Sequence, residues 1–113
     1  MINNNKFQAL YSDMITCTQC VRLVSFREKI ATEKRKQYIN EEYWGKPVPG
    51  YGDINAEILF VGLAPAAHGG NRTGRVFTGD KSADFLMKCM HYTGLANQIN
   101  SDYRDDGLKL KNA

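Results

Sequence analysis

The chain has 113 residues, of which 42% are hydrophobic, and its formal net charge is +3. This length fits one small domain or part of one, and the apolar content excludes a fully disordered chain. The mild positive charge is compatible with a polyanionic partner but does not by itself indicate one. The N-terminal stretch has no apolar core of a secretory signal, and no run reaches the length of a membrane span. The three cysteines therefore indicate free thiols or metal ligands in a reducing, cytoplasmic compartment.

The N-terminal part predicts helices around a cysteine pair. Apolar residues recur at helical spacing over residues 6–16, which predicts an amphipathic helix. The motif CTQC follows, and the spacing of Cys17 and Cys20 lets both thiolates reach one metal centre; the pair can equally be ordinary thiols or half of a zinc site. Residues 21–44 are predicted to be partly helical. Their dense Arg and Lys content over 22–36 is usually a solvated helix face, but a DNA-binding enzyme would use it to contact phosphates.

The middle of the chain predicts a strand that leads into a glycine-rich loop. Residues 45–53, GKPVPGYGD, are typical of a turn-forming linker. The apolar run EILFVGL at 57–63 is short and bounded by turn residues, which predicts a buried strand of the parallel type. The loop GLAPAAHGGNRTGRVFTGD then occupies residues 62–80.

The C-terminal part predicts one more helix and the beginning of a strand. The helix is expected over residues 82–93, with Gly94 as its stop. Its inner face is expected to consist of Phe85, Leu86, Cys89 and Met90. Cys89, on this apolar face, is expected to be a small buried hydrophobe and not a ligand. Leucine and lysine alternate over residues 108–111, which is typical of the first half of a strand.

The loop does not match the common nucleotide-binding designs. A dinucleotide fingerprint needs a second glycine two residues after Gly62, and this glycine is absent. Gly69 and Gly74 have the spacing of a P-loop, but Arg75 and Val76 stand where that motif requires Lys and Ser or Thr. The residues therefore argue against both designs.

The loop does offer groups that suit a flat, polar ligand. Glycine and alanine let the backbone approach such a ligand closely, and consecutive N–H groups can bind its carbonyl or a phosphate. Phe77 is an aromatic residue on a polar loop, so it can stack on a planar base, although core packing is the ordinary role of a phenylalanine. Asp80, at the junction with the next helix, can cap that helix or polarise a water, and the two roles are compatible.

These residues resemble a known family. The loop over residues 62–80 is very similar to the first active-site motif of type 5 uracil-DNA glycosylases, which are related to the type 4 iron–sulfur glycosylases. YWGKPVPGYGD resembles the lead-in to the family's first strand, DFLMKCMHYTGLANQ resembles its next helix, and CTQC matches the first ligand pair of its [4Fe–4S] cluster. The loop motif is specific, whereas a CxxC motif alone is not. The resemblance implies an α/β fold, a doubly wound three-layer sandwich with a central parallel sheet, of which residues 1–113 would form the N-terminal part, up to about the second strand.

The resemblance also implies a function and its residues. Such an enzyme flips uracil or another deaminated base out of DNA and hydrolyses its N-glycosidic bond. Asp80 would orient the attacking water, and Phe77 would stack on the base. Backbone contacts with the base would come from Gly62, Leu63, Ala64, Pro65, Ala66 and Ala67. DNA contacts are expected from His68, Asn71, Arg72 and Arg75, and cluster ligation from Cys17 and Cys20. His68 is given no catalytic role, since its place in the loop suits a phosphate contact or loop geometry.

Parts of the family pattern have no counterpart in these 113 residues. They are the remaining ligand cysteines, a later polar residue of the pocket, and a second motif of the His-Pro-Ser type that enters DNA. We therefore expect this chain alone to be inactive and to hold no stable [4Fe–4S] cluster. The expected partner is DNA containing uracil or another deaminated base, with no membrane and no known protein partner. The alternative is a non-catalytic module that binds nucleic acid or another partner through the basic helix and the loop.

Overall fold

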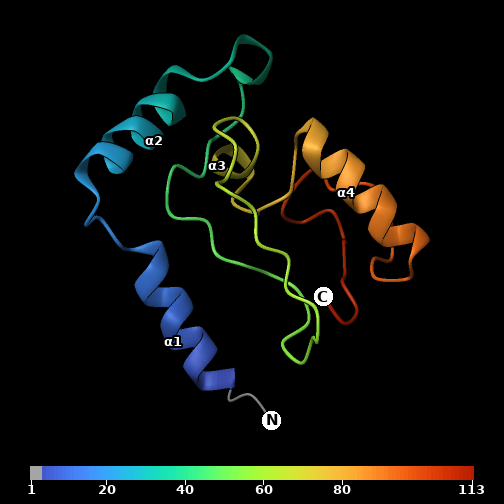
Figure 1. The fold of residues 1–113 in the computed structure, drawn as a ribbon. Coiled ribbons are helices and arrows are strands. Elements are labelled where there is room, and N and C mark those ends of the chain that lie inside the picture. Colours follow the sequence, from blue (N-terminus) through green and yellow to red (C-terminus); the bar gives the residue numbers. More distant parts are fainter. Residues whose placement is uncertain (1–3) are drawn as a thin grey trace.

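The computed structural model describes residues 4–113 and is built from helices joined by long irregular segments (Figure 1). Residues 1–3, part of the stretch that lacks a signal-like apolar run, lie outside the described residues. In chain order the elements are α1 (Asn4–Ile15), α2 (Val21–Glu33), the 3₁₀ helix η1 (Lys36–Tyr38), α3 (Gly70–Thr73) and α4 (Lys81–Tyr92). None of the helices over residues 4–113 is long and apolar enough to cross a membrane.

The helix predictions are confirmed at both ends of the chain. The helix predicted over residues 6–16 corresponds to α1, which begins and ends within two residues of those bounds. The basic segment predicted to be partly helical contains α2. The prediction for residues 82–93 corresponds to α4, and Gly94 has the positive φ of 81° expected just after a helix.

The two N-terminal helices lie beside the rest of the chain as an arm (Figure 1). No residue of α1 or α2 is buried, and the apolar side chains that make α1 amphipathic remain exposed: Phe7 at 47% and Leu10 at 56%. Among the described helices only α2 and α3 contact each other. The apolar face of α1 is therefore largely exposed in the described part of the chain, and that of α2 is only partly covered, by the segment around α3.

The core lies under α4, on a face that the prediction gave only in part: Met90 is buried and Leu86 packs against the core, as predicted. Phe85 is 74% exposed and Cys89 is exposed as well, so the prediction of a buried Phe85 and Cys89 is wrong. The residues of α4 that are buried are Ala83, Met87 and Met90. These positions follow the helical i, i+4, i+7 repeat, and the buried face shares Met90 with the predicted one. The core is small because only Ala96 and Leu108 join the two methionines as buried apolar partners.

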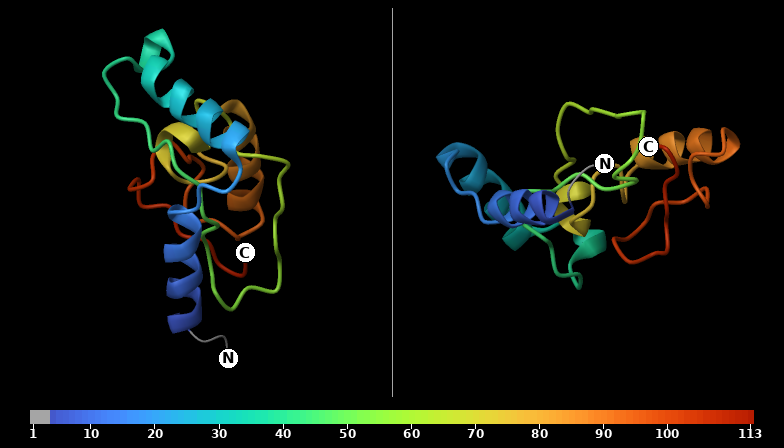
Figure 2. Two further views of the ribbon diagram at one scale, coloured as in Figure 1. Left: turned by 90° about the vertical axis from the view of Figure 1, so that its left-hand side faces the viewer. Right: turned by 90° about the horizontal axis from the view of Figure 1, so that it is seen from below.

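The segment at residues 57–63 is not the buried strand that was predicted. Its apolar side chains alternate in exposure, with Ile58 and Phe60 near 40% and Leu59 and Val61 above 80%, and Leu63 is fully exposed. This alternation is that of a strand with one covered face. The backbone groups of residues 58–65 make no hydrogen bond within the described chain. A strand needs a hydrogen-bonding neighbour to satisfy these groups, and none of residues 4–113 pairs with this segment. Figure 2 shows the segment bowing away from the rest of the chain.

The C-terminal tail is joined to the middle of the chain by local pairing instead of a sheet. Leu110, in the predicted half-strand, forms an isolated antiparallel bridge with Ala96. The backbone N–H of Asp53 donates to the carbonyl of Ala113 over 2.8 Å, which ties the linker to the tail. No strand occurs anywhere in residues 4–113, so the predicted central parallel sheet has no counterpart in this part of the fold.

Candidate functional site

The glycine-rich loop has an exposed first part and an anchored second part. Residues 62–66 are exposed, and the chain then enters the short helix α3 and becomes buried. Trp44 fastens this helix, since its backbone N–H donates to the carbonyl of Arg72 over 3.0 Å and its ring lies against Gly74. A Cβ at Gly74 would come within 2.8 Å of the indole, and the backbone there has a φ of +79°, so this position requires glycine.

Asp80 closes the loop as the N-cap of α4. Its Oδ1 accepts a hydrogen bond from the backbone N–H of Ala83 over 2.8 Å, which confirms the capping role. The other carboxylate oxygen, Oδ2, lies against the Cα of Gly69, where any Cβ would overlap it. The cap thus uses one oxygen and directs the second toward the loop, so that capping leaves Oδ2 available for a second role.

Phe77 has an unusual backbone conformation and a partly buried ring. Its φ of 48° lies in the left-handed region, which costs a non-glycine residue about 1–2 kcal/mol. The ring lies against Gly62, where a Cβ would be 3.0 Å from Cζ, and it packs against the core. It also lines an apolar hollow of about 90 Å³ between α4 and residues 58–60. The structure therefore places Phe77 where the exposed strand-like segment, the loop and the core meet.

Arg75 lies at the centre of a buried polar network. The residue is 6% exposed, and it donates to Thr78 Oγ1 over 2.9 Å, to Ser101 Oγ over 3.0 Å and to both carboxylate oxygens of Asp106 over 2.9 and 3.0 Å. Burial raises the pKa of Asp106, but hydrogen bonds from backbone N–H groups and from Arg75 outweigh it and hold that pKa below its usual value. In this structure the donors of Arg75 are used internally, and its expected contact with DNA stays a prediction.

Arg72 and Asn71 are also engaged inside the protein. Arg72 is 4% exposed, forms a 2.7 Å ion pair with Glu41, and donates through Nε to the carbonyl of His68 over 2.6 Å. Its guanidinium carbon also lies 3.8 Å from the ring centroid of Tyr38. Asn71 is buried and donates to the carbonyl of Arg27. These two side chains therefore build the loop and, in this structure, are not presented to a DNA backbone.

His68 is the expected DNA contact that keeps an accessible side chain. It is half-buried, and its Nδ1 lies 2.8 Å from the hydroxyl of Tyr43. Burial, together with the nearby charges of Arg35 and Arg72, lowers the pKa of His68 below its ordinary value. Tyr43 was not singled out by the sequence, because no local motif marks a tyrosine that meets its partner twenty-five residues later.

The cysteines do not form a metal site within the described chain. Cys17 and Cys20 lie on the connection between α1 and α2, and Cys20 is exposed, as is Cys89 on α4. Residues 4–113 contain no group of three or more His, Cys, Asp or Glu side chains placed to hold a metal ion. A cubane cluster normally takes four thiolates, so the donors present do not fit a complete [4Fe–4S] site.

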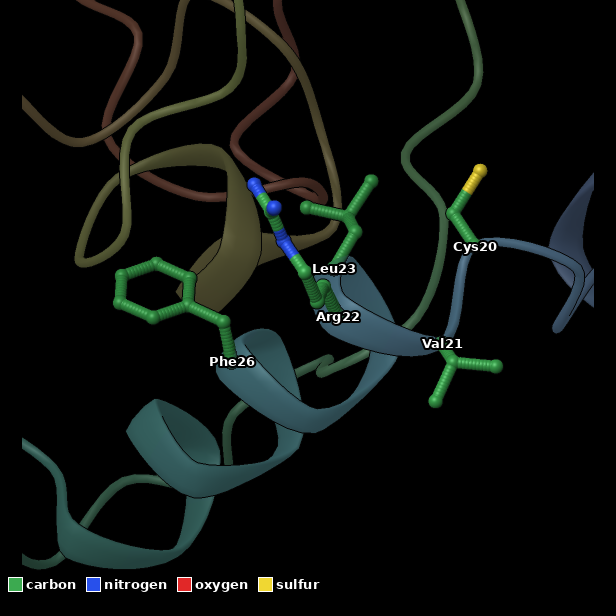
Figure 3. A pocket seen from close by; sticks show the side chains of 5 residues that line it. All are labelled: Cys20, Val21, Arg22, Leu23 and Phe26. Carbon is green, nitrogen blue, oxygen red and sulfur yellow. The ribbon is translucent and has the colours of Figure 1, made fainter.

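An open hollow accompanies Cys20 at the start of α2. Its volume is about 840 Å³. Figure 3 shows the side chains that line it, which are Cys20, Val21, Arg22, Leu23 and Phe26. Val21 is 74% exposed and Phe26 55%, so this is an apolar surface that the described chain leaves open beside a thiol.

Comparison with known proteins places the chain in a family. The profile of the uracil DNA glycosylase superfamily matches residues 49–110, which hold the end of the linker, the exposed segment, the loop and α4. The chain belongs to the uracil-DNA glycosylase superfamily.

Within that superfamily the chain is similar to proteins named Type-5 uracil-DNA glycosylase. The relative from Pyrobaculum aerophilum is 51% identical over 98 residues, which cover 87% of this chain and 42% of the relative. The relatives from Mycobacterium leprae and Thermus thermophilus are 49% and 48% identical, over 88% of this chain and 44% and 45% of their own lengths. The chain thus spans less than half the length of these relatives.

Proposed function

We propose that the chain forms the N-terminal part of a uracil-DNA glycosylase domain of the type 5 kind. The domain flips uracil or another deaminated base out of DNA and hydrolyses its N-glycosidic bond. The single observation that carries the proposal is the 51% sequence identity to a protein of that name, over an alignment that covers 87% of this chain. The proposed fold of the whole domain is the α/β sandwich with a central parallel sheet, in which residues 57–63 would gain strand neighbours.

The loop geometry supports a division of roles within the proposed site. Asp80 is the proposed catalytic residue, because capping occupies only Oδ1 and Oδ2 is directed toward the loop. An orienting carboxylate of this kind would hold the water that attacks the sugar. The exposed turn of residues 62–67 would contact the base through its backbone. Phe77, held in its strained conformation between Gly62 and the core, would border the base with one ring face.

The chain alone is expected to show no appreciable uracil excision. Flipping needs a pocket that holds the extruded base, and most of the loop surface proposed for it is open to solvent. The measurement is cleavage of a uracil-containing oligonucleotide, with alkali to break the abasic strand. The matched comparison is a fusion in which residues 1–113 replace the corresponding part of the Pyrobaculum aerophilum relative, and this fusion is expected to excise uracil.

The same pair of proteins tests the alternative function. Turnover by the purified 113-residue chain would contradict the proposal that it is an incomplete enzyme. A folded but inactive fusion that still binds DNA would favour the non-catalytic nucleic-acid-binding module.

The basic face of α2 is the proposed phosphate contact outside the loop. Arg22 and Lys29 are exposed, and the structure gives neither an internal partner. Changing both to glutamate is expected to weaken binding to all duplex sequences alike and to lower the slope of log K against log salt by about 2, one for each lost phosphate contact. Fluorescence titrations of a labelled duplex at several salt concentrations measure this slope. The matched control changes Lys109 and Lys111 in the tail to glutamate. An equal drop in the salt slope there would mean that Arg22 and Lys29 contribute only through the net charge of the chain and not through a defined phosphate contact.

Cys17 and Cys20 are the proposed contribution of this chain to the family's iron–sulfur cluster. When bound, such a cluster would fix the connection between α1 and α2, which carries both thiols. The other thiolates would have to come from the part of the domain that these residues do not include. No catalytic step is assigned to the cluster.

A further inference from the structure

Tyr43 and His68 form a side-chain contact at the edge of the glycine-rich loop. Tyr43 is 7% exposed, and its hydroxyl lies 2.8 Å from Nδ1 of His68, with the two rings edge to face at 83°. The same hydroxyl oxygen accepts a hydrogen bond from the backbone N–H of Arg35 over 3.1 Å. A phenol has one proton to donate, and with Arg35 supplying an accepted hydrogen bond, the hydroxyl is placed to donate that proton to Nδ1 of His68.

This arrangement favours one tautomer of the imidazole. When Nδ1 of His68 accepts the phenolic hydrogen bond, the neutral ring carries its own proton on Nε2. The backbone of His68 is held as well, since its carbonyl accepts from Nε of Arg72. Nε2 has no protein partner among residues 4–113, so it remains available as a donor.

The two arginines near His68 favour the neutral imidazole, and the two carboxylates nearby oppose them only in part. Arg35 precedes η1, and Arg72 lies on α3, where Glu41 offsets part of its charge through the 2.7 Å ion pair. The carboxylate of Asp80, at the start of α4, lies against the neighbouring residue Gly69. Burial and the two arginines disfavour the imidazolium, and a protonated Nδ1 would also lose the bond from Tyr43.

We propose that Tyr43 is a positioning residue that fixes His68 as the neutral tautomer with its proton on Nε2, and that this N–H donates to a phosphate oxygen of bound DNA. The phosphate contact rests on the proposed function, whereas the tautomer does not. A neutral donor keeps its hydrogen bond between pH 6 and 8, where an ordinary histidine would gain and lose its charge. The affinity that this contact contributes toward the DNA backbone would thus not depend on pH in this range.

The tautomer is tested on the free 113-residue chain by ¹⁵N NMR of its imidazoles. The chain has two histidines, and His91 is an internal reference, because its Nδ1 lies 3.0 Å from the carbonyl of Ala96 and must donate to it. The expected spectrum shows opposite tautomers, Nε2–H for His68 and Nδ1–H for His91. A His68 that carries its proton on Nδ1, or that titrates at or above its ordinary pKa of about 6.5, would overturn the proposal.

The variant Tyr43→Phe removes the hydroxyl and keeps the ring. His68 is expected to lose its single tautomer and to titrate at higher pH than in the parent chain. Affinity for a labelled DNA duplex at pH 7.5 is expected to fall by up to about fivefold, the effect of losing the whole of one hydrogen bond. Circular dichroism establishes that the variant is folded, and if it is not, the spectrum of the parent chain still decides the tautomer.

A conservative replacement separates positioning from a purely structural effect. His68→Gln supplies an amide N–H that does not depend on Tyr43, so adding Tyr43→Phe to it should change DNA affinity less than twofold. A full fivefold loss in that background would overturn the positioning role. If the spectrum is as expected but Tyr43→Phe leaves DNA affinity unchanged, the tautomer stands and the phosphate contact is overturned.

Discussion

Replacing Arg75 with methionine is expected to destabilise the chain by about 3 kcal/mol, the largest effect of any single substitution considered. Methionine fills a similar volume but provides none of the donors that Thr78, Ser101 and Asp106 now use. The Asp106 carboxylate would stay largely buried without its counter-charge, with its side chain only 10% exposed. Urea unfolding followed by circular dichroism measures the loss as a lower midpoint.

The matched control makes the same change at an exposed arginine. Arg22→Met, at the start of α2, is expected to change the free energy of unfolding by no more than about 0.5 kcal/mol. Equal losses in both variants would mean that the network around Arg75 does not stabilise the fold. A pH series adds a second measure. The folded-state pKa of Asp106 is depressed, so its contribution is present above its unfolded value of about 3.9 and is lost as the pH falls through the folded value.

Asp80→Asn is expected to lower the rate of uracil excision at least about 100-fold while leaving the fold intact. Asparagine caps a helix about as well as aspartate, so the bond to the backbone of Ala83 would be retained. What the substitution removes is the negative charge on the oxygen that lies against Gly69. The assay uses the active fusion described above, with single-turnover rates and DNA affinity measured separately, and only the rate is expected to change.

Two controls isolate the charge of Asp80. Asp84→Asn makes the same change one turn further along α4, at an exposed position, and is expected to leave the rate unaltered. Asp80→Ala removes the cap too, which adds about 1 kcal/mol of destabilisation to the loss of rate. An excision rate in Asp80→Asn equal to that of the parent would leave Asp80 with its capping role alone.

Local patterns in the sequence were sufficient for the helices and for the cap. The spacing of apolar residues located α1 and α4 to within two residues, because that periodicity is a property of the helix itself. Asp80 followed by a helix and Gly94 after it gave both ends of α4, since each end is formed by neighbours in sequence. The resemblance of the loop to a family motif agrees with the superfamily match over residues 49–110.

Features that depend on distant partners were predicted less well. Residues 57–63 have the composition of a buried strand, but burial and pairing require neighbours that none of the described residues supplies. Arg72 and Arg75 look like DNA contacts in a glycine-rich loop, yet Glu41 and Asp106, about thirty residues away, take their guanidinium groups into the interior. The inner face of α4 was predicted correctly at Leu86 and Met90 but wrongly at Phe85 and Cys89, which are exposed, because the apolar pattern does not show which side of the stripe meets the core.

The uncovered segment at residues 58–65 also determines how the chain behaves in concentrated solution. Unpaired strand-like backbone with apolar side chains acts as a template for other copies, and folded proteins guard such edges with charge, proline or a cover. Here Glu57 stands at one end and Pro65 at the other, and the seven residues between them carry no charge. We therefore expect this segment to promote intermolecular β-structure, at a rate of aggregation that rises with protein concentration. Rapid coverage of this segment during synthesis would favour the folded chain over an aggregate.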